Sequence, residues 1–187
     1  MEFKKLSDEA LVSYIQENNG KGYEEIIDRY QNPLFRYVSR LLKDADQVED
    51  VIQDTFISTY ENINGFDTKR KFSSWIYRIA HNKAINEIRK QKKNVSLEDA
   101  PEIEDRESKG SIEKEITEKE ARALLEKNIQ TLPLKYQEVI ILRYLEDKSY
   151  EEISDILKIP TSTVGVRIKR GLDKLKTTIN INIEDYL

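Results

Sequence analysis

The stretch SYEEISDILKIPTSTVGVRIKRGLDKL, residues 149–175, contains two amphipathic helical segments separated by a short turn. The first segment opens with a capping-box pattern, Ser149 and then Glu152, and continues with apolar residues at helical spacing. The turn occupies residues 158–160 and ends in proline, and a second helix is expected from Thr161. Two short helices joined in this way predict a helix-turn-helix unit, whose second helix enters the major groove of DNA. The buried stripe of that second helix is predicted to be Val164, Ile168, Leu172 and Leu175.

The opposite side of this second helix carries the side chains that we expect to meet DNA. Hydroxyl, guanidinium and ammonium groups on that side are able to reach bases or phosphates. Residues 158–176 hold 6 basic side chains and 1 acidic one. This excess favours DNA binding over the alternative, a helical hairpin with a solvated basic face. The predicted DNA-binding residues of the helix-turn-helix, which spans residues 149–170, are Thr161, Ser162, Thr163, Arg167, Lys169 and Arg170.

A second basic region occurs at residues 67–93, with 9 basic and 2 acidic side chains in a chain whose formal charge is -4. A helix is expected over 72–92, with an apolar stripe that includes Phe72 and Trp75. Four residues fall outside that stripe: Tyr77, His81, Asn82 and Lys83. Aromatic rings beside a basic surface suit single-stranded nucleic acid, because a ring stacked on an unpaired base contributes ~1–3 kcal/mol while cations follow the phosphates.

Acidic side chains gather on one face of the helix expected over 46–62, and residues 1–66 carry 13 acidic groups against 7 basic ones. The other face is an apolar stripe of Val48, Val51, Ile52, Thr55, Phe56, Thr59 and Tyr60. Either the acidic face is an ordinary solvated surface, or it is a docking surface for a basic partner. The candidate docking residues are Asp46, Glu49, Asp50, Gln53 and Asp54.

The organisation of the whole chain follows from its periodicity. The 3.6-residue hydrophobic period recurs throughout and two-residue alternation is almost absent, which predicts an all-α protein. Residues 94–111 lack apolar periodicity and are rich in acids, so we expect a flexible acidic linker. The chain should then form two small helical domains, 1–93 and 112–187. The expected helices cover residues 7–18, 22–42, 46–62, 72–92, 112–129, 133–146, 150–157 and 161–178.

Several classes of function are disfavoured by what the sequence lacks. It has no cysteine, a single histidine (His81) and no glycine-rich phosphate loop, so it offers no nucleophile–base pair and no His/Cys metal cluster. An enzyme is therefore not expected, nor is a cofactor, a metal or a small-molecule substrate. The opening residues, MEFKKLSDEA, lack the apolar core of a signal peptide, and the longest aliphatic run, residues 139–142, is too short to cross a membrane.

Three segments together resemble bacterial RNA polymerase sigma factors of the sigma-70 family, in its extracytoplasmic-function (ECF) group. DADQVEDVIQDTFISTYENINGF resembles the helix with which such factors hold the clamp helices of RNA polymerase. KFSSWIYRIAHNKAINEIRKQKK resembles the element that opens and reads the promoter's -10 region. LPLKYQEVIILRYLEDKSYEEISDILKIPTSTVGVRIKRGLDKL resembles the domain that reads the -35 element. Their order and spacing cover nearly the whole chain.

The resemblance implies a division of labour between the two domains. Residues 1–93 would be a region 2-like domain that binds core RNA polymerase and recognises and melts the -10 DNA, and residues 112–187 a region 4-like domain that recognises the -35 element. The implied protein is cytoplasmic, acts in stress responses as a monomer on polymerase and promoter DNA, and is restrained by an anti-sigma factor, commonly a membrane-bound one. The implied -10 candidates are Asn64, Asp67, Lys71, Phe72, Trp75, Tyr77, Arg78, His81, Asn82, Lys83 and Arg89.

The helix-turn-helix departs from the family pattern at four positions. Ser154 stands where the family often has alanine, and Lys158 stands where it often has glycine in the turn. A left-handed backbone at Lys158 would cost a residue with a side chain some stability. Gly165 and Val166 replace residues that are commonly polar in the recognition helix. These departures bear on promoter specificity and not on the family.

Two other interpretations remain open from the residues alone. A free-standing helix-turn-helix repressor or activator would need a dimerisation surface to match palindromic half-sites, and no sustained heptad pattern is evident. A purely structural or protein-interaction module would not need two separated basic regions. Palindromic footprinting without polymerase would favour the first interpretation, and failure to bind either nucleic acid or polymerase would favour the second.

Overall fold

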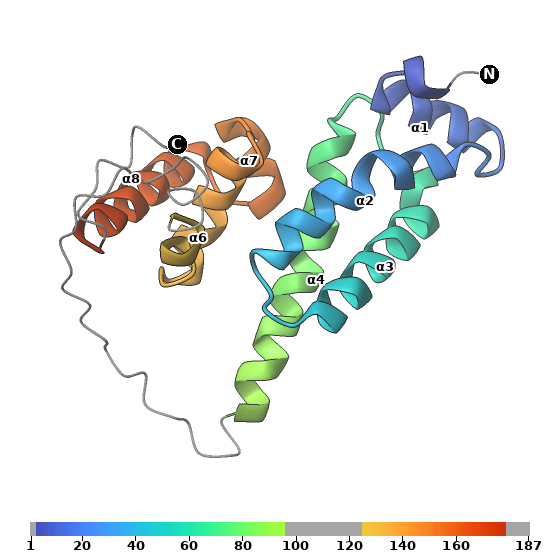
Figure 1. Cartoon of the computed structure of the whole chain (residues 1–187). Helices are drawn as coiled ribbons and strands as arrows, with labels where there is room; N and C mark the ends of the chain where they lie inside the picture. The colour runs from blue at the N-terminus through green and yellow to red at the C-terminus, as the bar shows by residue number, and fades with distance from the viewer. Residues whose placement is uncertain (1–2, 96–124, 179–187) are drawn as a thin grey trace, which may run out of the picture.

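The computed structural model describes residues 3–95 and 125–178, and the regular elements in these two ranges are all helical (Figure 1). The predicted all-α class with two helical domains is therefore confirmed. Within the described ranges, no helix combines the length and the apolar character needed to cross a membrane. The elements are η1 (Phe3–Lys5), α1 (Asp8–Glu17), α2 (Tyr23–Ser39), α3 (Ala45–Asn62), η2 (Ile63–Gly65), α4 (Phe72–Val95), α6 (Leu134–Ile140), η3 (Ile141–Leu145), α7 (Tyr150–Leu157) and α8 (Thr161–Thr178).

The N-terminal module is built by α1 to α4, with α4 packed against α3, α2 and α1 (Figure 1). Side-chain caps fix where two of these helices begin: Ser7 accepts a hydrogen bond from the Ala10 amide, and Asp44 accepts from the amides at the start of α3. Apolar side chains at helical spacing then meet in one core, in which Leu11, Leu34 and Ile76 are fully buried. The module therefore holds α4 firmly along its inner face.

The C-terminal module contains the predicted helix-turn-helix with the predicted bounds. Ser149 and Glu152 form both hydrogen bonds of the capping box that begins α7. Lys158 ends α7 in the left-handed conformation, with φ 54° and ψ 44°. Ser154 Oγ donates a hydrogen bond of 2.6 Å to the Ile159 carbonyl, so this small hydroxyl ties the helix to the turn. The helix expected over 133–146 is instead α6 followed by the π-helical segment η3.

Helix α8 is seated closely on α6. A Cβ atom added at Gly171 would lie 2.5 Å from Cδ1 of Ile140, which is closer than real atoms approach. A side chain at Gly171 would therefore have to displace Ile140 in this helix contact, beside which Val164 and Ile168 are buried as predicted.

The predicted linker lies almost entirely outside the described residues. Helix α4 extends to Val95, two residues into the segment 94–111, and residues 96–124 are not described. Of the helix expected over 112–129, the described residues 125–129 are helical. The exact domain limits thus stay predictions.

Candidate nucleic-acid interface

The outward face of α8 carries most of the residues predicted to read DNA. Lys169 and Arg170 are exposed on this helix, together with Thr161 and Ser162 in its first turn, and Thr163 is half-buried. The structure thus brings five of the six predicted residues to one accessible or partly accessible surface.

Arg167 is the exception among the predicted -35 residues. Its Nη1 donates a hydrogen bond of 2.8 Å to Oε1 of Glu138, and its side chain is 26% exposed. Burial raises the pKa of the Glu138 carboxyl, while the Arg167 charge opposes that rise. Arg167 is therefore held inside the C-terminal module, where it compensates a buried carboxylate.

Val166 is an outward residue of α8 that the prediction did not include. It is 49% exposed, one turn after Ser162 and three residues before Lys169. The signal that could have found it was an apolar residue off the buried stripe of an otherwise polar helix face.

The predicted docking face of α3 is open to solvent. All five candidates on this face are exposed, and Asp54 lies 3.7 Å from the Lys83 ammonium of α4. Ile57 is 56% exposed on the same helix and was not predicted, although an isoleucine outside the apolar stripe was visible in the sequence. Tyr60 was placed in the buried stripe, and this is wrong: it is 50% exposed and lies edge-on against Tyr23. The face therefore combines carboxylates with apolar contact area.

The predicted -10 residues divide into three groups by burial. Asn64, Asp67, Lys71, Asn82 and Arg89 are exposed, Trp75, Arg78 and Lys83 are half-buried, and Phe72, Tyr77 and His81 are buried. Only part of this predicted set therefore faces solvent.

Phe72 and Trp75 belong to an aromatic cluster at the start of α4. The Phe72 ring is fully buried and lies 5.6 Å from the rings of both Tyr30 and Trp75. Phe66 packs on Trp75 with ring centroids 4.9 Å apart. The Phe72 amide donates to Oε1 of Glu9, which supplies an acceptor at the helix start. Phe72 thus supports the loop before α4, whereas Trp75 borders its surface.

A small hollow lies at this surface, with a cavity volume of about 120 Å³. Aromatic side chains form part of its wall and three cations form another part. Its lining residues are Gly65, Phe66, Asp67, Arg70, Lys71, Trp75, Arg78 and Asp155. The hollow therefore combines stacking surface with positive charge, and Asp155 comes to it from the C-terminal module.

Carboxylates of α7 form ion pairs with two of the cations beside this hollow. Glu152 lies 3.1 Å from the Lys71 ammonium, and Asp155 lies 3.2 Å from the Arg78 guanidinium. Burial alone would raise the pKa of both carboxyls, but hydrogen bonds and positive neighbours outweigh it and lower each pKa below its ordinary value. In this arrangement the C-terminal module partly covers Arg78 and pairs with Lys71, which stays exposed.

Tyr77 is also held by the C-terminal module. Its hydroxyl donates to Oε2 of Glu146 at 2.8 Å, and the Lys148 ammonium lies 4.3 Å from the centre of its ring. Glu146 also accepts from Arg40 at 2.8 Å, and burial raises the pKa of this carboxyl. The expectation that Tyr77 lies outside the buried surface of α4 is therefore wrong, because a second contact surface covers it.

The C-terminal module also covers His81, so the expectation that this residue lies outside the buried surface of α4 is wrong as well. Its Nδ1 lies 2.9 Å from the Tyr37 hydroxyl, and its Nε2 lies 3.7 Å from Oε2 of Glu138. Burial, with a smaller effect of the Arg89 charge, lowers the pKa of His81 to about 4. The imidazole is therefore neutral at pH 7 and lies between α2 and the carboxylate that also holds Arg167.

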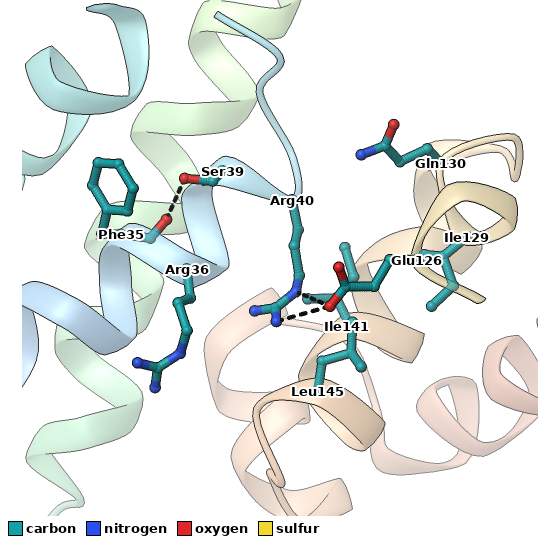
Figure 2. A pocket seen from close by; sticks show the side chains of 9 residues that line it. All are labelled: Phe35, Arg36, Ser39, Arg40, Glu126, Ile129, Gln130, Ile141 and Leu145. Carbon is teal, nitrogen blue, oxygen red and sulfur yellow. Dashed lines mark hydrogen bonds and ion pairs between the residues drawn. The ribbon is translucent and has the colours of Figure 1, made fainter. Parts of the chain in front are cut away.

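A larger cavity of about 280 Å³ lies between the end of α2 and the C-terminal module (Figure 2). Arg40 points across it and lies 3.1 Å from Glu126, the pair joined by dashed lines in Figure 2. The lining residues are Phe35, Arg36, Ser39, Arg40, Glu126, Ile129, Gln130, Ile141 and Leu145. The modules thus meet through several ion pairs around an incompletely filled space.

Comparison with known families matches two parts of the chain. Residues 26–94 match the model of sigma-70 region 2, and residues 122–175 match the model of sigma-70 region 4. The chain is 34% identical over 175 residues to the ECF RNA polymerase sigma factor SigW of Bacillus subtilis, covering 88% of this chain and 92% of that protein. It is 33% identical over 188 residues to the ECF RNA polymerase sigma-E factor of Haemophilus influenzae, covering 94% of this chain and 97% of that protein.

The chain belongs to the sigma-70 family of RNA polymerase sigma factors, in its ECF group. It directs promoter-specific initiation of transcription and is not an enzyme, as predicted.

The fold is shared with two solved structures of low sequence identity. CnrH, in complex with the cytosolic domain of CnrY, superimposes with a TM-score of 0.70 at 22% identity, covering 92% of this chain and 97% of that chain. RpoE of Bartonella quintana, in complex with the anti-sigma factor NepR, superimposes with a TM-score of 0.67 at 20% identity, covering 87% and 99%.

Proposed function

We propose that this sigma factor reads its promoter through two surfaces on separate modules. The outward face of α8 reads the -35 element, with Lys169 and Arg170 contacting DNA beside the hydroxyls of the first turn. The hollow bordered by Trp75 and Arg78 receives an unstacked base of the -10 element, while neighbouring cations contact its phosphates. The observation that carries this proposal is that stacking surface and positive charge converge on one hollow, apart from the basic face of α8.

The -10 surface works only after the modules separate. Glu152 and Asp155 pair with the cations that would otherwise meet phosphates, and their negative charge at the hollow opposes the entry of DNA. Surface ion pairs of this kind contribute only about 0–1 kcal/mol each, so binding to polymerase can replace them. The free chain therefore binds promoter DNA weakly, and core polymerase supplies the open arrangement, with one sigma chain on each polymerase.

The exposed face of α3 is the proposed docking surface for core polymerase. Its carboxylates face a basic partner, and Ile57 supplies apolar area at the same site. We further propose that the chain acts in the cytoplasm. We also propose that an anti-sigma protein restrains it, because RpoE of Bartonella quintana, which shares its fold, was solved in complex with the anti-sigma factor NepR.

Charge reversal on α3 tests the docking face. D50K/D54K should weaken binding to core polymerase by about tenfold or more, since two attractive charges become repulsive. The measurement is an affinity titration with core polymerase, followed by run-off transcription on a promoter library. E24K/D28K on α2 is the matched control, with the same charge change at exposed acids outside this face. Equal binding by both variants would place the docking face elsewhere.

A further inference from the structure

An apolar side chain stands on the surface of α8 that is proposed to read the -35 element. Val166 is 49% exposed and shares the outward face with Ser162 and Lys169. A single exposed valine is common on protein surfaces and would need no explanation elsewhere. Here it lies in the first two turns of the recognition helix, the part that contacts base edges.

The residues at 165 and 166 disfavour a helix, and packing within the protein does not offset that cost. Gly165 and Val166 are both weaker helix formers than alanine. A Cβ added at Gly165 would meet Tyr150 Cε2 at 3.5 Å, an ordinary contact, so packing within the protein does not demand glycine. Residues that disfavour the local structure and that packing does not require are expected at functional positions.

Val166 places a small apolar surface on the outward face of α8. The methyl groups of Val166 offer contact but no hydrogen bond. In the major groove the apolar feature of a base pair is the C5-methyl group of thymine. We propose that Val166 contacts the C5-methyl of a thymine in the -35 element and thereby sets the base preference at that position. This inference rests on the proposed reading of the -35 element by α8.

Replacing thymine by deoxyuridine tests the contact, because it removes only the methyl group. Holoenzyme is assembled from the full chain and core RNA polymerase, and each thymine of a -35 element selected from a promoter library is replaced singly. At one position, initiation by the wild type should fall about fourfold, the factor that corresponds to one methyl-sized apolar group. V166A should reduce initiation by a similar factor on the thymine template and should show no further loss with deoxyuridine.

Three controls separate a base contact from a general loss of function. V166T keeps the shape of valine and one of its methyl groups, so it should retain part of the sensitivity to deoxyuridine. Deoxyuridine in the -10 element should affect wild type and V166A by the same factor. The thermal unfolding temperature of V166A should not be lower than that of the wild type, since the side chain is exposed and alanine is the better helix former.

Each outcome bears on one claim. Full sensitivity of V166A to deoxyuridine overturns the inference, as does a -35 element that contains no methyl-sensitive thymine. Initiation that does not depend on the -35 sequence at all would instead overturn the proposed reading by α8. Dependence on -35 sequence without methyl sensitivity would leave that reading intact and remove only the role of Val166.

Discussion

The two helices proposed to read the promoter differ in how they present their side chains. On α8, Ser162, Val166 and Lys169 face solvent. On α4, Tyr77 is 2% exposed and His81 is 7% exposed, because the C-terminal module covers them. A basic helix in the sequence therefore does not by itself indicate an accessible surface. Helix α8 can meet DNA in this arrangement, whereas α4 needs a rearrangement first.

The difference arises from where the carboxylates lie. Glu146, Glu152 and Asp155 all belong to the C-terminal module, where Glu146 and Asp155 contact α4 and Glu152 contacts Lys71 just before it. Helix α8 packs on α6 and α7, and Arg167 alone among its predicted readers is paired inward. The acidic side of the C-terminal module thus closes α4 while its basic side remains open.

Acidification should have the largest effect, and it acts on the closed surface of α4. His81 has a pKa of about 4 in the folded chain against an ordinary 6.5, so the unfolded chain binds a proton that the folded chain does not. The stability that depends on a neutral His81 is therefore fully present above pH 6.5, and it is lost as the pH falls from 6.5 toward 4. Between pH 7 and pH 5 the free energy of unfolding should fall by about 2 kcal/mol more than in H81N, measured by urea unfolding. The same pH dependence in H81N would show that His81 is not the titrating group.

Neutralising the α7 carboxylates should open the surface of α4. E152Q/D155N removes two attractions to Lys71 and Arg78, while glutamine at residue 152 can still serve the capping box. Binding of the free chain to single-stranded -10 DNA should tighten by about tenfold, measured by fluorescence anisotropy. E151Q/D173N makes the same charge change at exposed positions and should have a smaller effect. Equal effects would mean that total charge, and not the covering of α4, limits binding.

Two alanine substitutions should distinguish a reading residue from a supporting one on α8. K169A should weaken holoenzyme binding at -35-dependent promoters by about threefold and reduce the salt dependence, since an exposed cation is lost. R167A should lower thermal stability, by about 1 kcal/mol, because Glu138 loses its partner. If K169A lowers stability and R167A does not, the assignment of the two roles is reversed.

The smallest effect concerns the turn that joins α7 to α8. Lys158 has φ 54°, a conformation that costs a residue with a Cβ atom but not glycine. K158G should therefore raise the free energy of unfolding by about 0.5 kcal/mol, after the greater flexibility of glycine in the unfolded chain is counted. Differential scanning calorimetry would detect it, and a clear loss of stability would indicate that the ion pair of Lys158 with Asp155 matters more than the backbone.

The sequence predicted best the features that local signals determine. Helices α7 and α8 have the predicted bounds because a capping box and a proline mark their starts. Tyr77 and His81 were misplaced because the apolar stripe of α4 describes one packing surface, and the contact with the C-terminal module adds another. The π-helical η3 was missed for a related reason, since no residue type marks it. Contacts between modules depend on a tertiary arrangement that helical periodicity does not contain.

The tight seat of α8 at Gly171 has a consequence for how this chain can change its targets. The inward side of the helix packs closely on α6, where one added carbon atom would have to displace the end of the Ile140 side chain. Its outward side makes few demands on the rest of the protein, so side chains there can be exchanged without repacking the interior. New promoter preferences can therefore arise by a few substitutions on the outward face of α8, while the packing of the helix on α6 stays the same.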